Sequence, residues 1–259
     1  MAELLIEERT GHAVTLTLNR PEKLNAMTKP LWIALGQAVS RVSLDNSVRC
    51  LILRGAGEKS FSPGNDIAEF ASERSNKEQA IAYGKVMHET VQALADCPHP
   101  IIAQIHGICV GGGMEIASLA DIRICGKSSR FGAPIKNLGL VMAYDEMAPL
   151  ARLVGPSKAL EILLEGRIFG ADEALQIGFV SRVVDDEHVA SECAATAERV
   201  VCGAPLVARW HKKFARRLLN PSPLTAAERD ECFDCFDTED FRLGVEAFLS
   251  KQQAQFVGR

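Results

Sequence analysis

Three consecutive glycines at residues 111–113 separate an apolar stretch, residues 101–110, from a segment that begins with Met114 and Glu115. This pattern is typical of a buried strand that ends in a tight turn and is followed by a helix. Glycine has no Cβ, so a ligand can approach the backbone closely, and the first N–H groups of a helix have no partner within it. The sequence therefore predicts a backbone cradle for partial negative charge. Because Glu115 would place a carboxylate beside this cradle, a polarised carbonyl suits it better than a phosphate.

A second turn of this kind lies upstream, where residues 62–66 read Ser-Pro-Gly-Asn-Asp. Proline, glycine, asparagine and aspartate all favour tight turns, and the Asp66 side chain is expected to cap or orient its own turn. Two interpretations of the paired turns are open. Either both present backbone N–H groups to one ligand, or both only reverse the chain.

Composition narrows the class of protein. With 259 residues, 47% of them apolar and 24% charged, the chain is long enough to bury a substantial core and is neither disordered nor fibrous. A net charge of −4, with only two Trp and two Tyr, argues against a nucleic-acid partner. The most apolar stretch, residues 101–110, contains Gln104 and His106 and is too short to span a bilayer. We expect a globular enzyme without nucleic-acid or membrane partners.

The cysteines and the N-terminal residues predict a cytoplasmic protein. The first residues are acidic where a signal peptide would be basic, so the eight cysteines are expected to be cytosolic thiols. Cys232 and Cys235 are the only close pair. They have no second pair at metal-ligand spacing and lie in a region with a helical pattern. We expect two thiols on a helix, and no metal site.

Periodicity predicts the first elements. Apolar residues alternate with polar ones over residues 4–8 and 13–18, which indicates a hairpin of strands. Over residues 28–42 the apolar positions recur at helical spacing, with Thr28 placed as the cap and Pro30 near the start.

Strands and helices alternate along the rest of the first two thirds of the chain. Strands are expected at residues 49–54, 101–105 and 121–125, and a helix is expected at residues 77–95. This alternation favours α/β units with right-handed crossovers. Beyond Pro156 the pattern is almost wholly helical, with Val183 and Val184 as the last strand-like fragment.

In order and spacing these motifs resemble the crotonase superfamily, also called the enoyl-CoA hydratase/isomerase family. The likeness covers nearly the whole chain and rests on residues 19–21, 25–26, 61–67, 107, 111–115, 121, 131–134, 139–140, 153–155, 174, 178–180 and 247–249. It implies an α/β fold, a crotonase-like spiral of β-β-α repeats with a C-terminal helical region. The core would span residues 1–203, and residues 204–259 would cap the core and form a homotrimer or homohexamer.

The resemblance also implies an activity. Members of this family bind acyl-CoA thioesters and stabilise a thioester enolate, with CoA as part of the substrate and no separate cofactor. Their two oxyanion donors fall on the backbone N–H groups of Asn65 and Gly112. Deprotonation, conjugate addition and decarboxylation all place negative charge on the same thioester oxygen. The fold therefore implies a shared enolate intermediate rather than one particular reaction.

One departure from the family pattern concerns the catalytic acids. Hydratases of this family use two glutamates that share one water, and the first falls on Glu115, which could alternatively serve only the helix dipole. The second falls on Ile135, which cannot transfer a proton. Tyr144, Asp145 and Glu146 open the next predicted helix and are candidates to replace it, although acidic residues there are also common as caps.

The resemblance implies a further set of substrate-binding residues, which are Lys23, Asn25, Ala26, Ser62, Gly64, Asp66, Ile67, Gly111, Ile135 and, from a neighbouring chain, Lys251. A lysine expected after Ile67 is replaced by Ala68, which predicts weaker CoA binding.

We therefore expect hydration of a 2-enoyl-CoA, or a shift of its double bond, as the leading activity. Because Ile135 removes one acid, a decarboxylase or thioester hydrolase with a single acid–base group is the alternative. A non-catalytic acyl-CoA-binding subunit is the third possibility.

Overall fold

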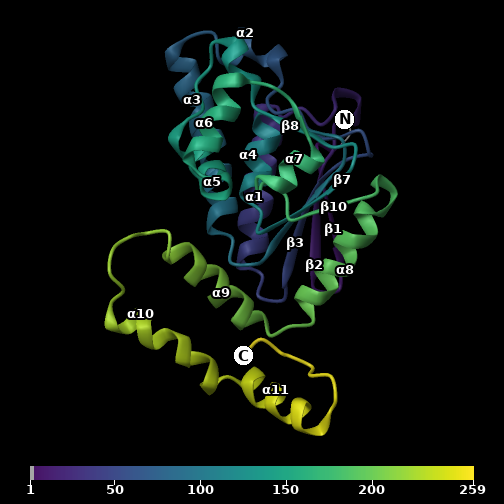
Figure 1. Cartoon of the computed structure of the whole chain (residues 1–259), viewed down its shortest axis with the longest axis vertical. Coiled ribbons are helices and arrows are strands. Elements are labelled where there is room, and N and C mark those ends of the chain that lie inside the picture. The colour runs from purple at the N-terminus through teal and green to yellow at the C-terminus, as the bar shows by residue number, and fades with distance from the viewer. Residues whose placement is uncertain (1–2) are drawn as a thin grey trace.

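The computed structural model describes residues 3–259 and contains two β-sheets flanked by helices (Figure 1). The larger sheet has the order β1-β2-β3-β5-β7-β10. Its strands are β1 (Leu5–Thr10), β2 (Ala13–Leu18), β3 (Cys50–Gly55), β5 (Ile101–Ile105), β7 (Ile122–Gly126) and β10 (Arg182–Val184). β1 and β2 pair antiparallel, as the predicted hairpin requires, and the other neighbours are parallel.

The smaller sheet has the order β4-β6-β8-β9. Its strands are β4 (Ser60–Ser62), β6 (Ile108–Val110), β8 (Arg130–Gly132) and β9 (Phe169–Gly170). Successive units of the chain each place one strand in the large sheet and the next in the small sheet, then continue into a helix. This repetition is the predicted spiral of β-β-α units, so the α/β fold class is confirmed. The short strands β4, β8 and β9 were not expected at these positions.

The core is built on both faces of the larger sheet. The helices of the core are α1 (Lys29–Leu44), α2 (Phe70–Glu73), α3 (Lys77–Asp96), α4 (Gly112–Ser118), α5 (Tyr144–Val154), α6 (Pro156–Glu165), α7 (Ala171–Gln176) and α8 (Val189–Val201). Leu51 and Leu53 of β3 join the main core, whereas Cys50 and Ile52 pack in a second cluster with α8. A strand that is buried on both faces is apolar at every position, which explains the continuous apolar runs in the sequence.

The first helix begins where the sequence predicted. The Thr28 side chain accepts a hydrogen bond from the N–H of Leu31, and Pro30 lies in the first turn of α1. The fully buried residues of α1 include Leu31, Trp32 and Leu35, so one face of the helix packs into the core.

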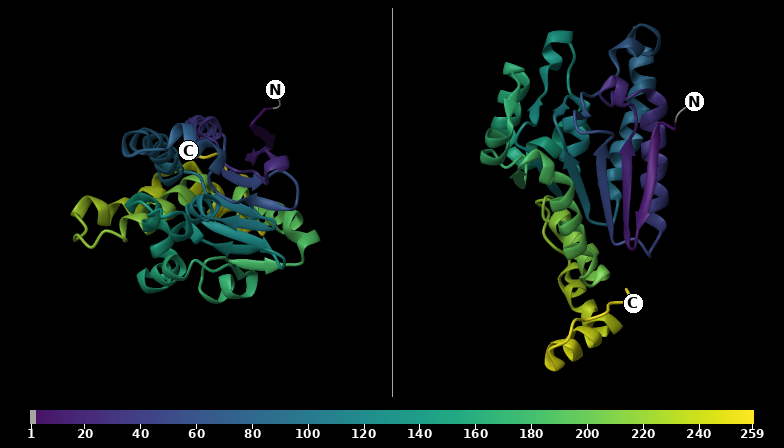
Figure 2. Two further views of the ribbon diagram at one scale, coloured as in Figure 1. Left: turned by 90° about the horizontal axis from the view of Figure 1, so that it is seen from above. Right: turned by 90° about the vertical axis from the view of Figure 1, so that its right-hand side faces the viewer.

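The C-terminal helices α9 (Pro205–Arg217), α10 (Ala226–Asp230) and α11 (Glu239–Ser250) extend away from the α/β core (Figures 1 and 2). α9 is tied to the core by Lys212, whose Nζ lies 2.6 Å from Asp121 Oδ2 and donates to the carbonyl of His99 at 2.6 Å. Beyond it, large apolar side chains are exposed, including Phe233, Phe236, Phe248 and Leu249.

All eight cysteines are free thiols, and Cys232 and Cys235 lie on a 3₁₀ helix, η5 (Glu231–Asp237). The other short helices of this type are η1 (Pro21–Lys23), η2 (Ile67–Glu69), η3 (Pro134–Leu138) and η4 (Asp186–His188). Within residues 3–259, no helix combines the length and apolar character that a membrane crossing requires.

Candidate active site

The two glycine turns meet because β4 and β6 are parallel neighbours, so that their carboxyl ends lie at the same edge of the small sheet. A Cβ placed on Gly64 would lie 2.5 Å from the backbone nitrogen of Gly112, and the φ of Gly64 is +94°. A Cβ on Gly112 would lie 3.2 Å from Gly64 Cα and 3.6 Å from the nitrogen of Asn65. The backbones can approach this closely only because Gly64 carries no side chain.

Asn65 and Gly112 both line one pocket of about 360 Å³. In the described part of the chain, neither backbone N–H has a hydrogen-bond acceptor. The neighbouring backbone groups are used: the carbonyl of Gly64 accepts from Met27 at 2.8 Å, and the N–H of Gly111 donates to Gly132 at 2.9 Å. The turns are thus held in place while two adjacent N–H groups stay available to a ligand.

The side chain of Asn65 anchors its own turn. Its Oδ1 accepts a hydrogen bond of 2.7 Å from Nε1 of Trp32, which is fully buried in α1. Sequence reasoning did not identify Trp32, because nothing in a helical apolar pattern separates a core tryptophan from one that also positions a turn.

Glu115 lies in the first turn of α4 with only 7% of its surface exposed. Its Oε2 is buried and has no hydrogen-bond partner. Burial first, and then the negative charge of Glu146, raise the pKa of Glu115 to about 8, while the charge of Arg74 acts in the opposite direction. Burial therefore favours the protonated form of Glu115.

Glu146 lies on the neighbouring helix, because α4 and α5 pack together. Its Oε2 accepts a 3.0 Å hydrogen bond from the N–H of Ala143, so the carboxylate caps α5. Its Oε1 lies 3.8 Å from Nε2 of His88 on α3, and the side chain is 11% exposed. The charge of Glu146 also raises the pKa of Glu115, so these two glutamates interact electrostatically.

The structure does not bring Tyr144 or Asp145 to the pocket. Tyr144 is 92% exposed, Asp145 is also exposed, and neither lines the pocket. Successive residues of a helix point in directions about 100° apart, so only one of three consecutive candidates can face inward. Here that residue is Glu146, which does not line the pocket itself but lies close enough to Glu115 to act on its pKa.

The pocket wall is largely apolar. It is formed by Lys23, Ala26, Pro63, Asn65, Asp66, Ile67, Phe70, Val110, Gly111, Gly112, Glu115, Pro134, Ile135, Leu138 and Leu140. Most of the predicted substrate-binding positions are therefore at the pocket, and Ile135 contributes hydrocarbon where hydratases of the family carry an acid.

Four of the predicted positions do not line this pocket: Asn25, Ser62, Gly64 and Lys251. Asn25 is fully buried, and its Nδ2 donates to the carbonyl of Ser60 at 2.7 Å. Ser62 Oγ donates to the carbonyl of Asn25 at 2.9 Å and accepts from the N–H of Gly64 at 3.1 Å. Both side chains thus support the turn from behind. Lys251 is exposed at the end of α11.

Asp66 acts on its own turn, as expected. Its Oδ1 accepts from the N–H of Ala68 at 3.1 Å, and its Oδ2 lies 3.0 Å from Arg20 Nη1. Although burial alone would raise it, these two contacts hold the pKa of Asp66 below its usual range. The carboxylate stays charged and fixes the start of η2.

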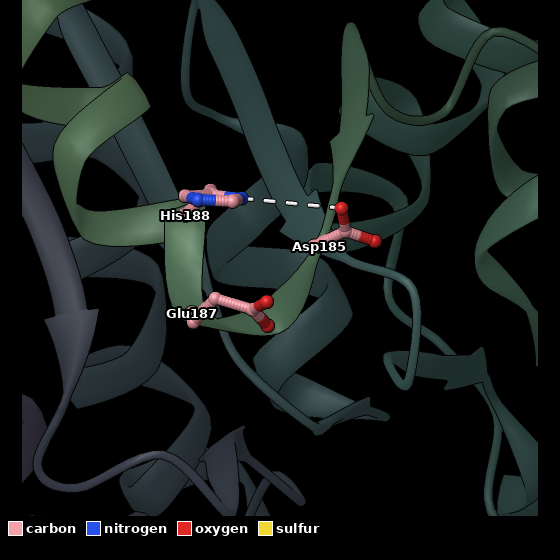
Figure 3. A group of neighbouring side chains, drawn as sticks. All are labelled: Asp185, Glu187 and His188. Carbon is pink, nitrogen blue, oxygen red and sulfur yellow. Dashed lines mark ion pairs between the residues drawn. The ribbon is translucent and has the colours of Figure 1, made fainter.

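Outside the pocket, Asp185, Glu187 and His188 gather on the surface at η4 (Figure 3). All three are exposed, and Asp185 already pairs with Lys127 at 2.6 Å. An exposed acidic group of this kind, with one member neutralised by a lysine, does not form a closed set of metal ligands.

Comparison with known proteins identifies the family. The family model described as enoyl-CoA hydratase/isomerase matches residues 8–259. A crotonyl-CoA hydratase of Syntrophomonas wolfei is 33% identical over 259 residues, which cover 99% of this chain and 99% of that protein. A short-chain-enoyl-CoA hydratase of Clostridium acetobutylicum is 33% identical over 253 residues, which cover 97% of this chain and 96% of that protein.

Solved structures agree with this result. The crystal structure of an enoyl-CoA hydratase/carnithine racemase from Magnetospirillum magneticum matches with a TM-score of 0.98 and 47% identity, covering 100% of this chain and 97% of that one. An enoyl-CoA hydratase from Bacillus anthracis matches with a TM-score of 0.93 and 27% identity, covering 99% and 100%. The resemblance seen in the sequence is confirmed: the chain belongs to the enoyl-CoA hydratase/isomerase family and acts on acyl-CoA.

Proposed function

We propose that this protein hydrates a 2-enoyl-CoA, with Glu115 and Glu146 as the acid–base pair. The observation that carries this proposal is the placement of Glu146 beside the buried Glu115, where it raises the pKa of Glu115. The addition of water needs two carboxyl groups in different roles, since one group accepts a proton and the other gives one.

In the proposed reaction the N–H groups of Asn65 and Gly112 bind the thioester oxygen. The oxygen of water forms a bond to the β-carbon, and Glu146 accepts the proton that this water loses. Negative charge moves to the thioester oxygen, where the two N–H groups stabilise it. The enolate then takes the proton of Glu115 at its α-carbon, and proton transfer restores the pair.

The electrostatic environment supports this division of roles. Burial disfavours the charged form of Glu115, which suits it to the role of proton donor. Glu146 accepts a hydrogen bond from the N–H of Ala143 and lies 3.8 Å from Nε2 of His88, so its position is fixed beside Glu115. Ile135 takes no part in proton transfer and instead provides an apolar wall for the acyl group.

Glu146→Gln should lower the hydration of crotonyl-CoA by a factor of about 10²–10⁴, because the amide keeps the size of the side chain but cannot accept a proton. The loss of conjugated enoyl-thioester absorbance measures the rate. Asp145→Asn is the matched control, since Asp145 is exposed and is not among the charges that shift the pKa of Glu115, and it should leave the rate unchanged. Equal hydration rates in the two variants would show that Glu146 takes no part in the reaction.

The pH dependence tests which glutamate carries the proton. Because the pKa of Glu115 is raised to about 8, kcat/KM for hydration should fall as the pH rises through this value and Glu115 loses its proton. Rates for the wild type and for Glu115→Gln, across the range in which both stay folded, give the profile. An increase through the same pH would assign the proton-accepting role to Glu115 instead.

Product analysis decides between this function and its alternatives. A shift of the double bond needs one group that moves a proton along the acyl chain, and Glu115 alone could serve it, since Ile135 supplies no acid. A decarboxylase or thioester hydrolase would act on malonyl-type or saturated thioesters, and a binding subunit would turn over none of them. A 3-hydroxyacyl-CoA product from crotonyl-CoA supports hydration.

We also propose that residues 204–259 form the contacts of a homotrimer or homohexamer. The exposed apolar side chains of this region, among them Phe236, Phe248 and Leu249, support the proposal, since a contiguous apolar surface on helices is typical of an interface. Lys251 lies at the end of the same region, where it could reach a neighbouring protomer's pocket.

A further inference from the structure

Arg74 is a half-buried arginine whose guanidinium has no acceptor. Its Cζ lies 4.6 Å from the ring centroid of Phe70 and 5.0 Å from that of Tyr83, so the group is held between two aromatic rings. Its Nη1 is buried and has no hydrogen-bond partner among residues 3–259. A buried N–H of a charged group without a partner is costly, so this arrangement favours an acceptor that arrives with a ligand.

The acidic groups near Arg74 are already engaged. Glu69 Oε2 accepts from the N–H of Lys29 at 2.9 Å and from the hydroxyl of Tyr83 at 3.0 Å. Glu73 pairs with Lys29 Nζ at 2.8 Å. No ion pair of Arg74 is found in the part of the chain that the structure describes.

The position of Arg74 relates it to the pocket. Phe70, against which the guanidinium packs, lines the pocket together with Glu115. The positive charge is close enough to lower the pKa of Glu115, although burial and Glu146 outweigh it. Burial disfavours the charged form of Glu115, and Glu115 forms no ion pair with Arg74. A positive charge without a counterion therefore lies next to the end of the pocket that holds the acid.

We propose that Arg74 binds a carboxylate carried by the acyl group, so that the preferred substrates are CoA thioesters of dicarboxylic acids. This inference rests on the proposed acyl-CoA function and names its substrate class. The planar guanidinium matches a carboxylate with two parallel hydrogen bonds, and the two rings restrict its orientation before the ligand binds. The apolar wall formed by Phe70, Ile135 and Leu140 would hold the carbons between the thioester and the carboxylate.

Binding of saturated thioesters tests this proposal without turnover. Succinyl-, glutaryl- and adipoyl-CoA are compared by calorimetry with butyryl-, pentanoyl- and hexanoyl-CoA, which have the same chain lengths but no terminal carboxylate. At the best chain length the wild type should bind the carboxylated thioester about 10- to 100-fold more tightly, the range expected for a charge-assisted hydrogen-bonded pair. Arg74→Met should abolish that preference, and Arg74→Lys should retain part of it.

Lys85→Met is the matched control, because it removes one exposed positive charge from α3 and should leave the preference intact. The proposal is wrong if the wild type shows no preference at any length, a result that needs no variant to fold. It is also wrong if Arg74→Met weakens the binding of CoA itself as much as the binding of glutaryl-CoA, since the guanidinium would then contact a phosphate. Hydration of crotonyl-CoA without any carboxylate preference would leave the proposed function standing, whereas failure of both thioester series to bind would overturn both.

Discussion

Glu115→Gln is expected to reduce turnover by about 10²–10⁴ with little change in KM, because the amide fills the same space but cannot give its proton to the α-carbon. The buried position of Glu115 is the reason for this expectation. Its Oε2 has no protein partner, so the proton it carries is available to a ligand in the pocket. Steady-state kinetics with crotonyl-CoA and with a carboxylated enoyl-CoA measure the effect.

Glu78→Gln is the matched control for the helix-dipole interpretation of Glu115. Glu78 is an exposed acidic residue in the first turn of α3, so it shares the favourable helix position but not the burial. If Glu115 only stabilised the start of α4, both variants would keep full turnover and lose a little stability. Unaltered turnover in Glu115→Gln would therefore remove it from catalysis.

The stability of Glu115→Gln should also depend on pH differently from that of the wild type. The pKa of Glu115 is about 8 in the folded protein against an ordinary value of 4.5, so the folded state keeps a proton that the unfolded chain releases. Between these values the wild type loses stability as the pH rises, because its unfolded state binds fewer protons. Glu115→Gln has no such loss and should gain stability relative to the wild type, by roughly 1–3 kcal/mol between about pH 5 and about pH 8. Urea titrations at both pH values measure this difference.

Much of the fold could be predicted from local sequence. The alternation over β1 and β2, the cap Thr28 and the glycines before α4 are each set by neighbouring residues, and the structure contains these elements close to their expected bounds. β9 was missed because it is only two residues long and depends on pairing with β8. No periodic pattern can be read from so short a segment.

The site was less predictable wherever it depends on helix phase or on distant contacts. Asp145 and Glu146 are adjacent acids, and the sequence does not show which one faces α4, because a rotation by one residue would exchange them. Arg74 and His88 carry no motif and reach the site only through the packing of α2 and α3 against it. The two glycine turns were predictable because a close approach of backbones requires glycine itself.

Gly112 allows the contribution of one backbone N–H to be measured. It is the first residue of α4, a position where proline is tolerated because the N–H has no partner within the helix. A side chain at this position would lie 3.2 Å from Gly64 Cα, which is a tight contact. Gly112→Ala introduces this contact and keeps the N–H, whereas Gly112→Pro introduces it and removes the N–H.

The difference between these two variants should report the loss of the donor together with the bulk of the proline ring, whose Cδ takes the place of the amide hydrogen. Gly112→Pro is expected to be slower than Gly112→Ala by about 10²–10³, the usual loss when one oxyanion donor is removed from a preorganised site. Circular dichroism and the thermal midpoint check that both variants are folded. If the two variants hydrate crotonyl-CoA at the same rate, the N–H of Gly112 does not bind the thioester oxygen. The oxyanion would then rely on Asn65 and on groups outside this turn, and the close approach of Gly64 to Gly112 would serve packing alone.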